Sequence, residues 1–332
     1  MAEATIRDVA RRAQVSIASV SRVLNGFENV SDETRARVVA AVTDLGYVPH
    51  AGARSLSMAR THAVGVVLPD LHGEFFSEIV RGMDRVASEQ DFLLLLSNLH
   101  PGTNASSAVR AMRGRVDGLL VMAPHLSEEE LAAALPPGVP VVLMNTRGDV
   151  HRHPAIHLDN AAGAAAVAEH FLALGRRRIV HIAGPPGNVD AQQRAEAFKS
   201  ALARHPEVQL ETLPGDFTED SGEAATEALL AVDRRFDALF AANDDMAIGA
   251  LQALRRVELR VPEDVAVAGF DDIPLARHLG LTTVRVRIAE LGAKALARLF
   301  ENLAGKTDVP AHELHSPELV VRATSGCGGG VR

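Results

Sequence analysis

The chain has 332 residues, which suits a small head and two further domains, and 47% of them are hydrophobic, enough for a sizeable core. A single cysteine, Cys327, excludes an internal disulfide, and no segment is apolar over the length that crosses a bilayer. The net charge of −8 divides unevenly, because residues 1–60 carry a balance of +2 and the remainder carries −10. Any contact with nucleic acid is therefore expected in the first sixty residues.

The segment that starts at Thr5 predicts a capped, amphipathic helix. Apolar residues recur at helical spacing along one side of it: Ile6, Val9, Ala10 and Ala13. Thr5 and Asp8, three residues apart, form the pattern of a capping box at its start.

A second helix is expected after a tight turn at Gln14 and Val15, with Ser16 as its cap. Its buried side should hold Val20, Val23 and Leu24. Its outer side should carry Ile17, Ala18, Ser21, Arg22 and Asn25. Two short helices joined in this way predict a helix-turn-helix, whose second helix enters the major groove of DNA.

A third helix should begin after Ser31, where two acidic residues follow, and stop at Gly46 in a left-handed conformation. Its buried side is expected to consist of Val38, Val39, Val42 and Leu45. These three helices predict one small head.

The rest of the chain alternates short apolar runs with helical stretches. The runs start at Ala63, Phe92, Val116 and Val139, and then at Arg177, Val208, Asp237 and Val265. The helical stretches cover about 78–90, 104–113, 128–135, 161–174, 190–204, 221–231, 245–256 and 288–303. Alternating β and α elements predict doubly wound parallel sheets, and the two sets of runs predict two α/β lobes.

Between head and body, the sequence GYVPHAGARSLSMARTHAVGVVLPD passes through a proline-started segment into a hydrophobic strand. With the head, this segment and the body in this order, the chain resembles the LacI/GalR (lactose-repressor) family of bacterial transcription regulators along nearly its whole length. The resemblance implies lobes of periplasmic-binding-protein type, joined by crossing segments near Asp159, Val286 and Leu319.

The expected division is a helix-turn-helix head at 1–46, a hinge helix and linker at 47–61, an effector-binding and dimerisation core at 62–323, and a disordered tail at 324–332. Within the core we expect lobe 1 at about 62–158 and 288–318, and lobe 2 at about 159–287 and 319–323.

Side chains on the outer face of the second helix are candidates to read DNA. Arg22 is suited to a bidentate contact with guanine, and Ile17 and Ala18 to apolar contact, as with a thymine methyl. Ser16, Ser21 and Asn25 are suited to phosphates or base edges. Further candidate DNA contacts are Thr5, Tyr47, His50 and Ala53. The family docks two heads on a near-palindrome, so we expect a homodimer on an inverted-repeat operator.

Pro49 suits the first turn of a hinge helix that runs to Leu56, but so short a helix is marginal alone, and Gly52 weakens it further. The resemblance makes Leu56 a wedge in the minor groove at the operator centre. We therefore expect this helix to fold on operator DNA; the alternative is a plain linker. His50 departs from the family's usual asparagine.

Polar residues at the carboxyl ends of strands are candidates to bind a small molecule. The family's motifs place Asn145, Arg194, Asn243 and Asp271 around the effector. They add Phe75, Phe76 and Phe217 as apolar walls, and we include Asp190, where purine-sensing relatives differ. An arginine fork and a carboxylate can each hold two adjacent hydroxyls, which suits a sugar or a ribose. The ordinary alternatives are turn formers and helix caps for the polar residues, and core packing for Phe75 and Phe76.

Other patterns are weaker. His151, His153 and His157 lie close together, but Pro154 interrupts them and no cysteine or carboxylate cluster frames a tetrahedral metal site. GPPGN lacks the lysine and hydroxyl of a phosphate-binding loop. The pair Asp271 and Asp272 has no positioned nucleophile beside it, so we expect neither a cofactor nor catalysis.

We predict a cytoplasmic DNA-binding repressor, with no membrane contact, that a sugar or sugar derivative controls as an inducer. A purine nucleoside is the alternative effector. A free solute-binding protein would need a signal peptide and no head, and a sugar-modifying enzyme would turn its ligand over. By resemblance, the dimer face involves Leu251, Arg255, Leu275, Leu279 and Leu281. No heptad-patterned extension follows Val321, so we expect a dimer without a tetramer.

Overall fold

The computed structural model describes residues 4–27, 29–48, 60–99, 105–147, 153–232, 235–306 and 312–326. These residues divide into two compact units, one of Met1–Ala63 with Gly114–Asp117 and the other of Val64–Arg113 with Gly118–Arg332. The hinge residues His50, Ala53 and Leu56, together with Cys327, lie outside the described residues.

The first unit contains the head, and its three predicted helices are confirmed: α1 (Ile6–Ala13), α2 (Ile17–Leu24) and α3 (Asp32–Leu45). The Asp8 carboxylate accepts hydrogen bonds from the backbone nitrogen and the hydroxyl of Thr5, at 3.0 and 2.6 Å. Ser16 and Ser31 accept from backbone nitrogens in the first turns of α2 and α3. Gly46 ends α3 at φ +58°, the left-handed conformation that glycine adopts without strain.

The head has a small core in which Val9, Val20 and Val38 are fully buried. One expectation is wrong, because Val39 is 53% exposed. The buried stripe of α3 runs through Val38, Ala41, Val42 and Leu45, which keep the i, i+3, i+4, i+7 spacing of one helix face. Val39 lies one position off that stripe.

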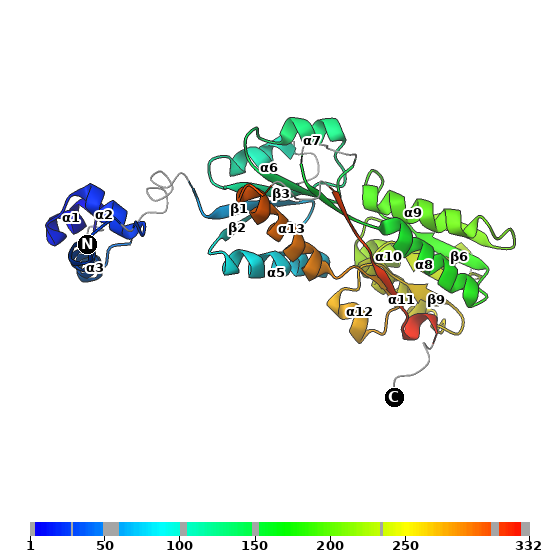
Figure 1. Cartoon of the computed structure of the whole chain (residues 1–332). Coiled ribbons are helices and arrows are strands. Elements are labelled where there is room, and N and C mark those ends of the chain that lie inside the picture. The colour runs from blue at the N-terminus through cyan, green and yellow to red at the C-terminus, as the bar shows by residue number, and fades with distance from the viewer. Residues whose placement is uncertain are drawn as a thin grey trace. The chain divides into compact units, whose positions relative to one another are not determined.

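The second unit holds two lobes, and lobe 1 is built on a sheet of six strands in the order β11-β5-β4-β3-β1-β2. The strands are β1 (Ala63–Leu68), β2 (Leu93–Asn98), β3 (Gly118–Met122), β4 (Val141–Met144), β5 (Ala155–Leu158) and β11 (His312–His315). The helices are α5 (Glu74–Glu89), α6 (Ala105–Met112), α7 (Glu128–Ala134) and α13 (Ile288–Leu303). Because the chain reverses direction after β2, right-handed crossovers place α5 on one face and α6 and α7 on the other (Figure 1).

Lobe 2 repeats this plan with four strands in the order β7-β6-β8-β9. The strands are β6 (Arg178–Ile182), β7 (Gln209–Leu213), β8 (Ala238–Ala241) and β9 (Ala266–Ala268). The helices are α8 (Asn160–Ala173), α9 (Val189–Leu202), α10 (Glu219–Val232), α11 (Asp244–Arg256) and α12 (Pro274–His278). The pairings of β6 with β7 and β8, and of β8 with β9, are all parallel, as the sequence predicts.

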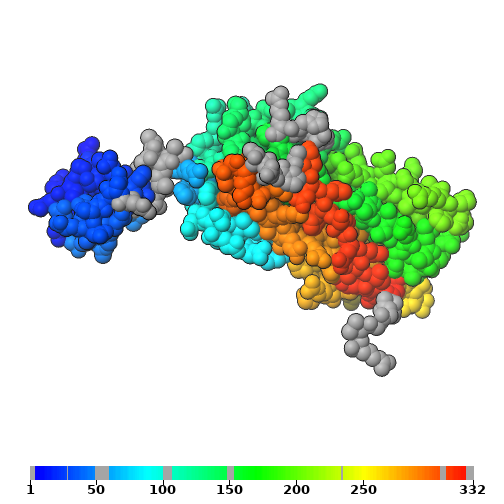
Figure 2. Space-filling view, in the orientation of Figure 1, coloured from blue at the N-terminus to red at the C-terminus, as the bar shows by residue number. Residues whose placement is uncertain are grey.

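Short segments tie the lobes together. β10 (Thr283–Arg285) pairs antiparallel with β12 (Glu318–Val320), while β11, just before β12, pairs with β5 of lobe 1. The C-terminal segment thus runs across the body from lobe 1 to lobe 2, as the orange-red to red band shows in Figure 2. β5, β10, β11 and β12 were not expected as strands because, unlike the equally short β4, β8 and β9, they do not lie within a longer apolar run.

Two boundaries and one expected surface residue differ from expectation. Helix α5 begins at Glu74, four residues earlier than predicted, so Phe75 and Phe76 belong to its first turn. The body extends to Gly326, because Thr324 and Ser325 are buried and the Thr324 hydroxyl donates to the carbonyl of Val267 at 2.8 Å. The expected tail at 324–332 is therefore wrong over 324–326, and 327–332 lie outside the described residues. Leu281, expected on the dimer face, is fully buried in the core.

The two long helices of lobe 1 pack closely because glycines lie where they cross. A Cβ on Gly82 of α5 would collide with the backbone carbonyl of Ala289, and a Cβ on Gly292 of α13 with that of Ile79. Only glycine permits so close a backbone approach. The C-terminal helix is thereby held against the first helix of the same lobe.

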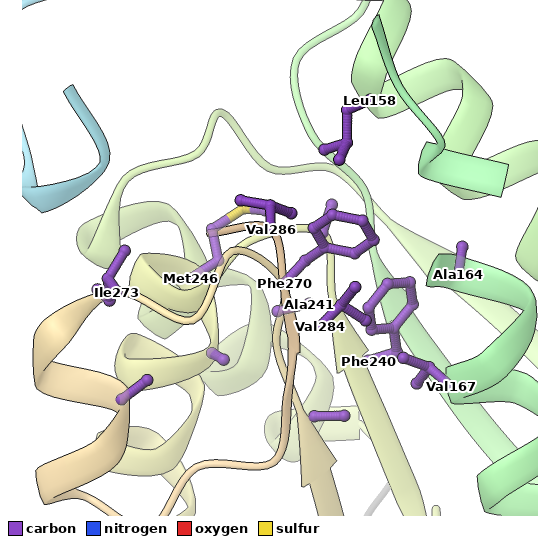
Figure 3. Packing of buried hydrophobic residues seen from close by; sticks show 14 of the residues in the cluster. Leu158, Ala164, Val167, Phe240, Ala241, Met246, Phe270, Ile273, Val284 and Val286 are labelled. Atoms are coloured by element: carbon purple, nitrogen blue, oxygen red, sulfur yellow. The ribbon is translucent and has the colours of Figure 1, made fainter. Parts of the chain in front are cut away.

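Lobe 2 is centred on an aromatic and aliphatic core in which Phe240 and Phe270 are fully buried, next to Val167 and Val284 (Figure 3). His181 belongs to this core, with its ring stacked on that of Phe240 at 4.9 Å between centroids. Its Nδ1 donates to the Phe240 carbonyl at 3.0 Å, which fixes the neutral tautomer, and no described residue bonds to Nε2.

This histidine should make the protein sensitive to acid. Burial lowers the pKa of His181 from 6.5 to about 4, the Phe240 bond opposes the shift, and the Arg194 charge adds to it. The imidazole of His181 takes up a proton more readily in the unfolded chain than in the folded protein. The contribution of His181 to the free energy of unfolding is therefore constant above pH 6.5 and is lost as the pH falls towards 4. We expect a loss of about 3 kcal/mol in the free energy of unfolding over that window.

The measurement is urea denaturation between pH 7 and pH 4. In His181→Gln the acid loss should shrink by about that amount, whereas in His278→Gln, at an exposed position of α12, it should match the parent protein. An equal pH dependence in both variants would show that His181 does not cause the acid loss.

Candidate functional site

The six-stranded sheet of lobe 1 and the four-stranded sheet of lobe 2 each reverse their strand order once. Ligands of open parallel sheets bind at such a reversal, outside the carboxyl ends of the strands. In lobe 1 the reversal lies between β1 and β3, which are followed by Pro69 and Pro124. In lobe 2 it lies between β6 and β8, which are followed by Pro185 and Asn243. All four residues line one cavity of about 380 Å³, so both sheets direct their ligand-binding edges into the same cleft.

Seven of the eight residues expected around an effector line this cleft: Phe75, Phe76, Asp190, Arg194, Phe217, Asn243 and Asp271. Phe75 and Phe76 pack edge to face, 5.2 Å between ring centroids, and offer an apolar wall from the start of α5. Asn243 also caps α11, since its Oδ1 accepts from the Met246 nitrogen at 3.0 Å. Capping and lining the cleft are therefore compatible roles for one side chain.

Arg194 is held in a fixed position at the floor of the cleft, 4% exposed. Its Nε donates to Asn160 Oδ1 at 2.8 Å and its Nη1 to the Ala242 carbonyl at 2.6 Å. The guanidinium stacks on Phe270, 3.7 Å from the ring centroid, and Nη2 lies 3.4 Å from Asp271 Oδ1. A guanidinium has five N–H groups, so two remain to meet a ligand after these contacts to Asn160, Ala242 and Asp271.

Two buried carboxylates lie near this arginine. Burial raises the pKa of Asp271 to about 7, against the lowering effect of the Arg194 charge, and the charges of Asp245 and Asp190 raise it further. Burial also raises the pKa of Asp190, which the Arg194 charge and hydrogen bonds from Asn160 and Asn145 oppose. Asp190 accepts from Asn160 Nδ2 at 2.7 Å. The three charges are thus coupled inside the protein.

Asn145 takes a different place from the other expected residues. It is not among the residues that line the cleft, and its Oδ1 accepts from the Leu158 nitrogen at 3.1 Å. Its bond to Asp190 places it behind the wall of the cleft, where it supports that carboxylate.

Backbone strain gathers at the same edge. Phe217, Asp271 and Asp272 have φ values of +74°, +117° and +57°, and Asn145 has +43°. Residues other than glycine rarely adopt these backbone conformations. Such conformations persist where the surrounding structure enforces them, often at ligand sites. Phe217 and Asp271, two of these strained residues, both line the cleft.

The acidic neighbours of Asn243 and Asp271 are structural. Asp244 is fully buried and accepts from the Ile273 nitrogen at 2.9 Å and from the Thr283 hydroxyl. Asp272 accepts from Arg285 Nε at 2.6 Å and pairs with Arg322. Each carboxylate has its partners within the lobe, so Asp271 and Asp272 do not form an acid and base pair facing one substrate.

Several residues of the cleft were not predicted from the sequence, among them Asp70, His72, His125, Asp216, Thr218, Glu219 and Asp245. The signal was present, because Asp70 follows β1, Asp216 follows β7, and Asp245 comes two residues after Asn243. The same rule that selected Asn243 and Asp271 applies to them.

On the head, α2 presents the expected face. Ser16, Ile17, Ala18 and Arg22 are exposed, and among the described residues no carboxylate pairs with Arg22. Ser21 and Asn25 are half-buried and bonded to each other at 3.3 Å, and the exposed Thr5 holds Asp8. Tyr47 packs in the core of the head and is 9% exposed.

Within the described residues, no group of three or more His, Cys, Asp or Glu side chains could hold a metal ion. His157 of β5 stacks on His312 of β11, 6.1 Å between ring centroids, as paired residues on neighbouring strands. Among the described helices, none combines the length and the apolar character that crossing a bilayer requires.

Comparisons with known proteins agree with this architecture. Residues 5–50 match the model of bacterial regulatory proteins of the lacI family, and residues 168–325 match a periplasmic binding protein-like domain. The chain is 37% identical over 324 residues to the HTH-type transcriptional regulator GalS of Salmonella typhimurium, covering 96% of this chain and 95% of the relative. It is 35% identical to the ribose operon repressor of Halalkalibacterium halodurans, covering 97% of each.

A solved structure of the lac repressor dimer bound to operator and the anti-inducer ONPF superimposes with a TM-score of 0.87 at 29% identity, covering 98% of this chain and 100% of that one. A lacI-type head and a periplasmic-binding-protein-like body therefore occur together in this chain and in the lac repressor fold. The chain belongs to the lacI family of bacterial regulatory proteins, DNA-binding transcriptional regulators whose body binds a small-molecule effector.

Proposed function

We propose that this protein is a cytoplasmic repressor that binds an inverted-repeat operator as a homodimer and is released by a sugar or sugar derivative bound in the cleft. One observation supports this most: a cleft formed by the ligand-binding edges of two sheets shares a chain with a helix-turn-helix head. The lac repressor dimer bound to operator has the same combination. Two heads related by a two-fold axis require an operator with the same symmetry.

A sugar suits the chemistry of the cleft. Arg194 offers two further N–H groups in a plane, and Asp271 Oδ1 has no hydrogen bond from a described residue other than its ion pair with Arg194. Both can bind neighbouring hydroxyls of a ring, while Phe75, Phe76 and Phe217 contact its apolar faces. GalS and the ribose operon repressor are relatives whose names refer to sugars.

Control requires that effector and operator act on one equilibrium. Both lobes contribute to the cleft, and hydrogen bonds already join them beside it. Arg147 of lobe 1 donates to the Gly187 carbonyl and to Gln192 of lobe 2, at 2.7 and 2.8 Å, and the Val189 nitrogen donates to the Pro124 carbonyl at 3.0 Å. A ligand that binds both lobes changes their relative position, and in the dimer this alters the spacing of the two hinges. Effector and operator then change each other's affinity by the same factor.

Thermal unfolding of the full chain against sugars and nucleosides tests the effector class, since a ligand that binds only the folded state raises Tm. We expect a sugar to raise Tm and to weaken operator binding in a gel-shift assay. A rise with nucleosides alone would favour the purine alternative. Turnover of the bound sugar would contradict a regulatory role.

The DNA-reading role of α2 has a separate prediction. Arg22→Ala should weaken binding to the operator by about 1 to 3 kcal/mol and relax the preference at one base pair, because a bidentate guanine contact is lost. The measurement is a binding titration with the operator, with single base-pair variants of it and with random DNA. An equal loss on specific and random DNA would reduce Arg22 to a phosphate contact.

A further inference from the structure

The cleft carries an excess of acid. Its lining includes the carboxylic acids Asp70, Asp190, Asp216, Glu219, Asp245 and Asp271, whereas its basic residues are Arg194, His72 and His125. Burial lowers the pKa of His125, which favours the uncharged ring. A site for a neutral sugar needs hydrogen-bonding groups but no such excess of one charge.

Arg194 does not balance this charge. It is bonded to Asn160 and Ala242 and lies beside Asp190 and Asp271, so its single charge already faces two carboxylates. Burial raises the pKa of Asp245 to about 6, the charges of Glu219 and Glu74 add to the rise, and the charge of His72 opposes it. The carboxylates therefore repel one another when the cleft holds no cation besides Arg194.

Three of the six acids already have hydrogen-bond partners among nearby residues of their own lobe. Asp70 accepts from the nitrogens of Leu71 and His72, at 2.7 and 3.1 Å, and Asp216 accepts from the Thr218 nitrogen at 2.9 Å. Glu219 is bonded to Gln252. These three are exposed, and we call them the acidic rim.

The other three acids, Asp190, Asp245 and Asp271, are the inner acids, and two of them have few donors. Asp271 is 5% exposed and lines the cleft, and its Oδ1 has the ion pair with Arg194 Nη2 at 3.4 Å but no hydrogen bond from another described residue. None of the hydrogen bonds between described residues ends on the carboxylate of Asp245, which lines the same cleft from the first turn of α11. Asp271 is buried and Asp245 is half-buried. A buried acceptor with too few donors is costly, and a ligand that supplies a donor to Asp271 recovers part of that cost.

We propose that the effector carries a protonated amine, as in an amino sugar, and that Asp245 and Asp271 hold its ammonium group. This inference rests on the proposed function and narrows the class of ligand. A hydroxyl can donate to one carboxylate but leaves the charge of both in place, whereas an ammonium donates three hydrogen bonds and compensates the charge. A phosphate or carboxylate on the ligand would meet the negative charges of the acidic rim and of Asp245 and Asp271, so the site rejects anionic sugars.

The test compares matched sugars by calorimetric titration of the full-length protein. Glucose, galactose and mannose are each compared with the 2-amino, the 2-acetamido and the 6-phosphate derivative. We expect an amino sugar to bind at least tenfold more tightly than its parent, and its phosphate not to bind. The 2-acetamido derivative is the matched control, because it keeps the substituent and removes the charge, and it should lose the gain.

Two variants test which residue causes the tighter binding of the amino sugar. Asp245→Asn should reduce the ratio of amino-sugar to parent-sugar affinity towards one, whereas Asp220→Asn, exposed in the hollow beside the cleft, should retain the ratio. A parent sugar that binds as tightly as its amine would overturn the inference and leave the proposed function standing. Binding of no sugar of any class would overturn both. A gain that survives Asp245→Asn would remove Asp245 from the ammonium site.

Discussion

Replacing Asp271 with asparagine should raise the effector concentration that releases the operator by about 5- to 150-fold, which corresponds to about 1 to 3 kcal/mol. The substitution keeps the size of the side chain, and asparagine tolerates the positive φ of +117° at this position better than most residues. It removes an acceptor oxygen and a charge beside Arg194. The measurement is operator release against the sugar that gives the largest rise in Tm.

Operator affinity without ligand is the internal control for this variant. A normal affinity together with an unchanged ligand response would move the effector site away from Asp271. A loss of operator binding without ligand would show that the side chain maintains the body of the repressor rather than its response.

Arg194→Met should destabilise the protein by about 3 to 5 kcal/mol. The variant keeps an unbranched side chain but removes the cation from Asp190 and Asp271, and the donors from Asn160 and Ala242. Both carboxylates then keep their protons to higher pH in the folded state than in the unfolded chain. Stability is therefore lost as the pH rises, and the deficit should be greater at pH 8 than at pH 5.

Urea denaturation at the two pH values measures this deficit. Arg178→Met, at an exposed position at the start of β6, is the matched control and should change stability by less than about 0.5 kcal/mol. A deficit in Arg194→Met that is the same at both pH values would mean that lost packing on Phe270, and not the buried charges, causes it.

A structural element can be predicted from the sequence when neighbouring residues or a repeated apolar run determine it, and not when it depends on pairing between distant short segments. The caps at Thr5, Ser16 and Ser31 and the stop at Gly46 are local, so the three head helices follow directly from neighbouring residues. The parallel sheets follow from repeated apolar runs. The pairing of β10 with β12 joins residues far apart in the chain through segments of three residues, which no local pattern announces.

The cleft shows the same limit in another form. Strand ends identified Asn243 and Asp271, but the same reasoning was not extended to Asp70, Asp216 and Asp245. The acidic character of the site emerges only when both sheets are assembled, because its members come from both lobes. Asn145 shows that a strand end alone does not place a residue in the cleft. It follows β4, but it lies behind the residues that line the cleft, where it supports Asp190.

The path of the C-terminal segment has a consequence for how the protein is synthesised. Lobe 1 needs β11 to complete the edge of its sheet beside β5, and lobe 2 needs β12 and the buried Ser325. Neither lobe can therefore finish folding until almost the whole chain has left the ribosome, whereas the head needs only its first 47 residues. A chain whose translation stops early would possess the DNA-reading helices without a completed cleft to control them.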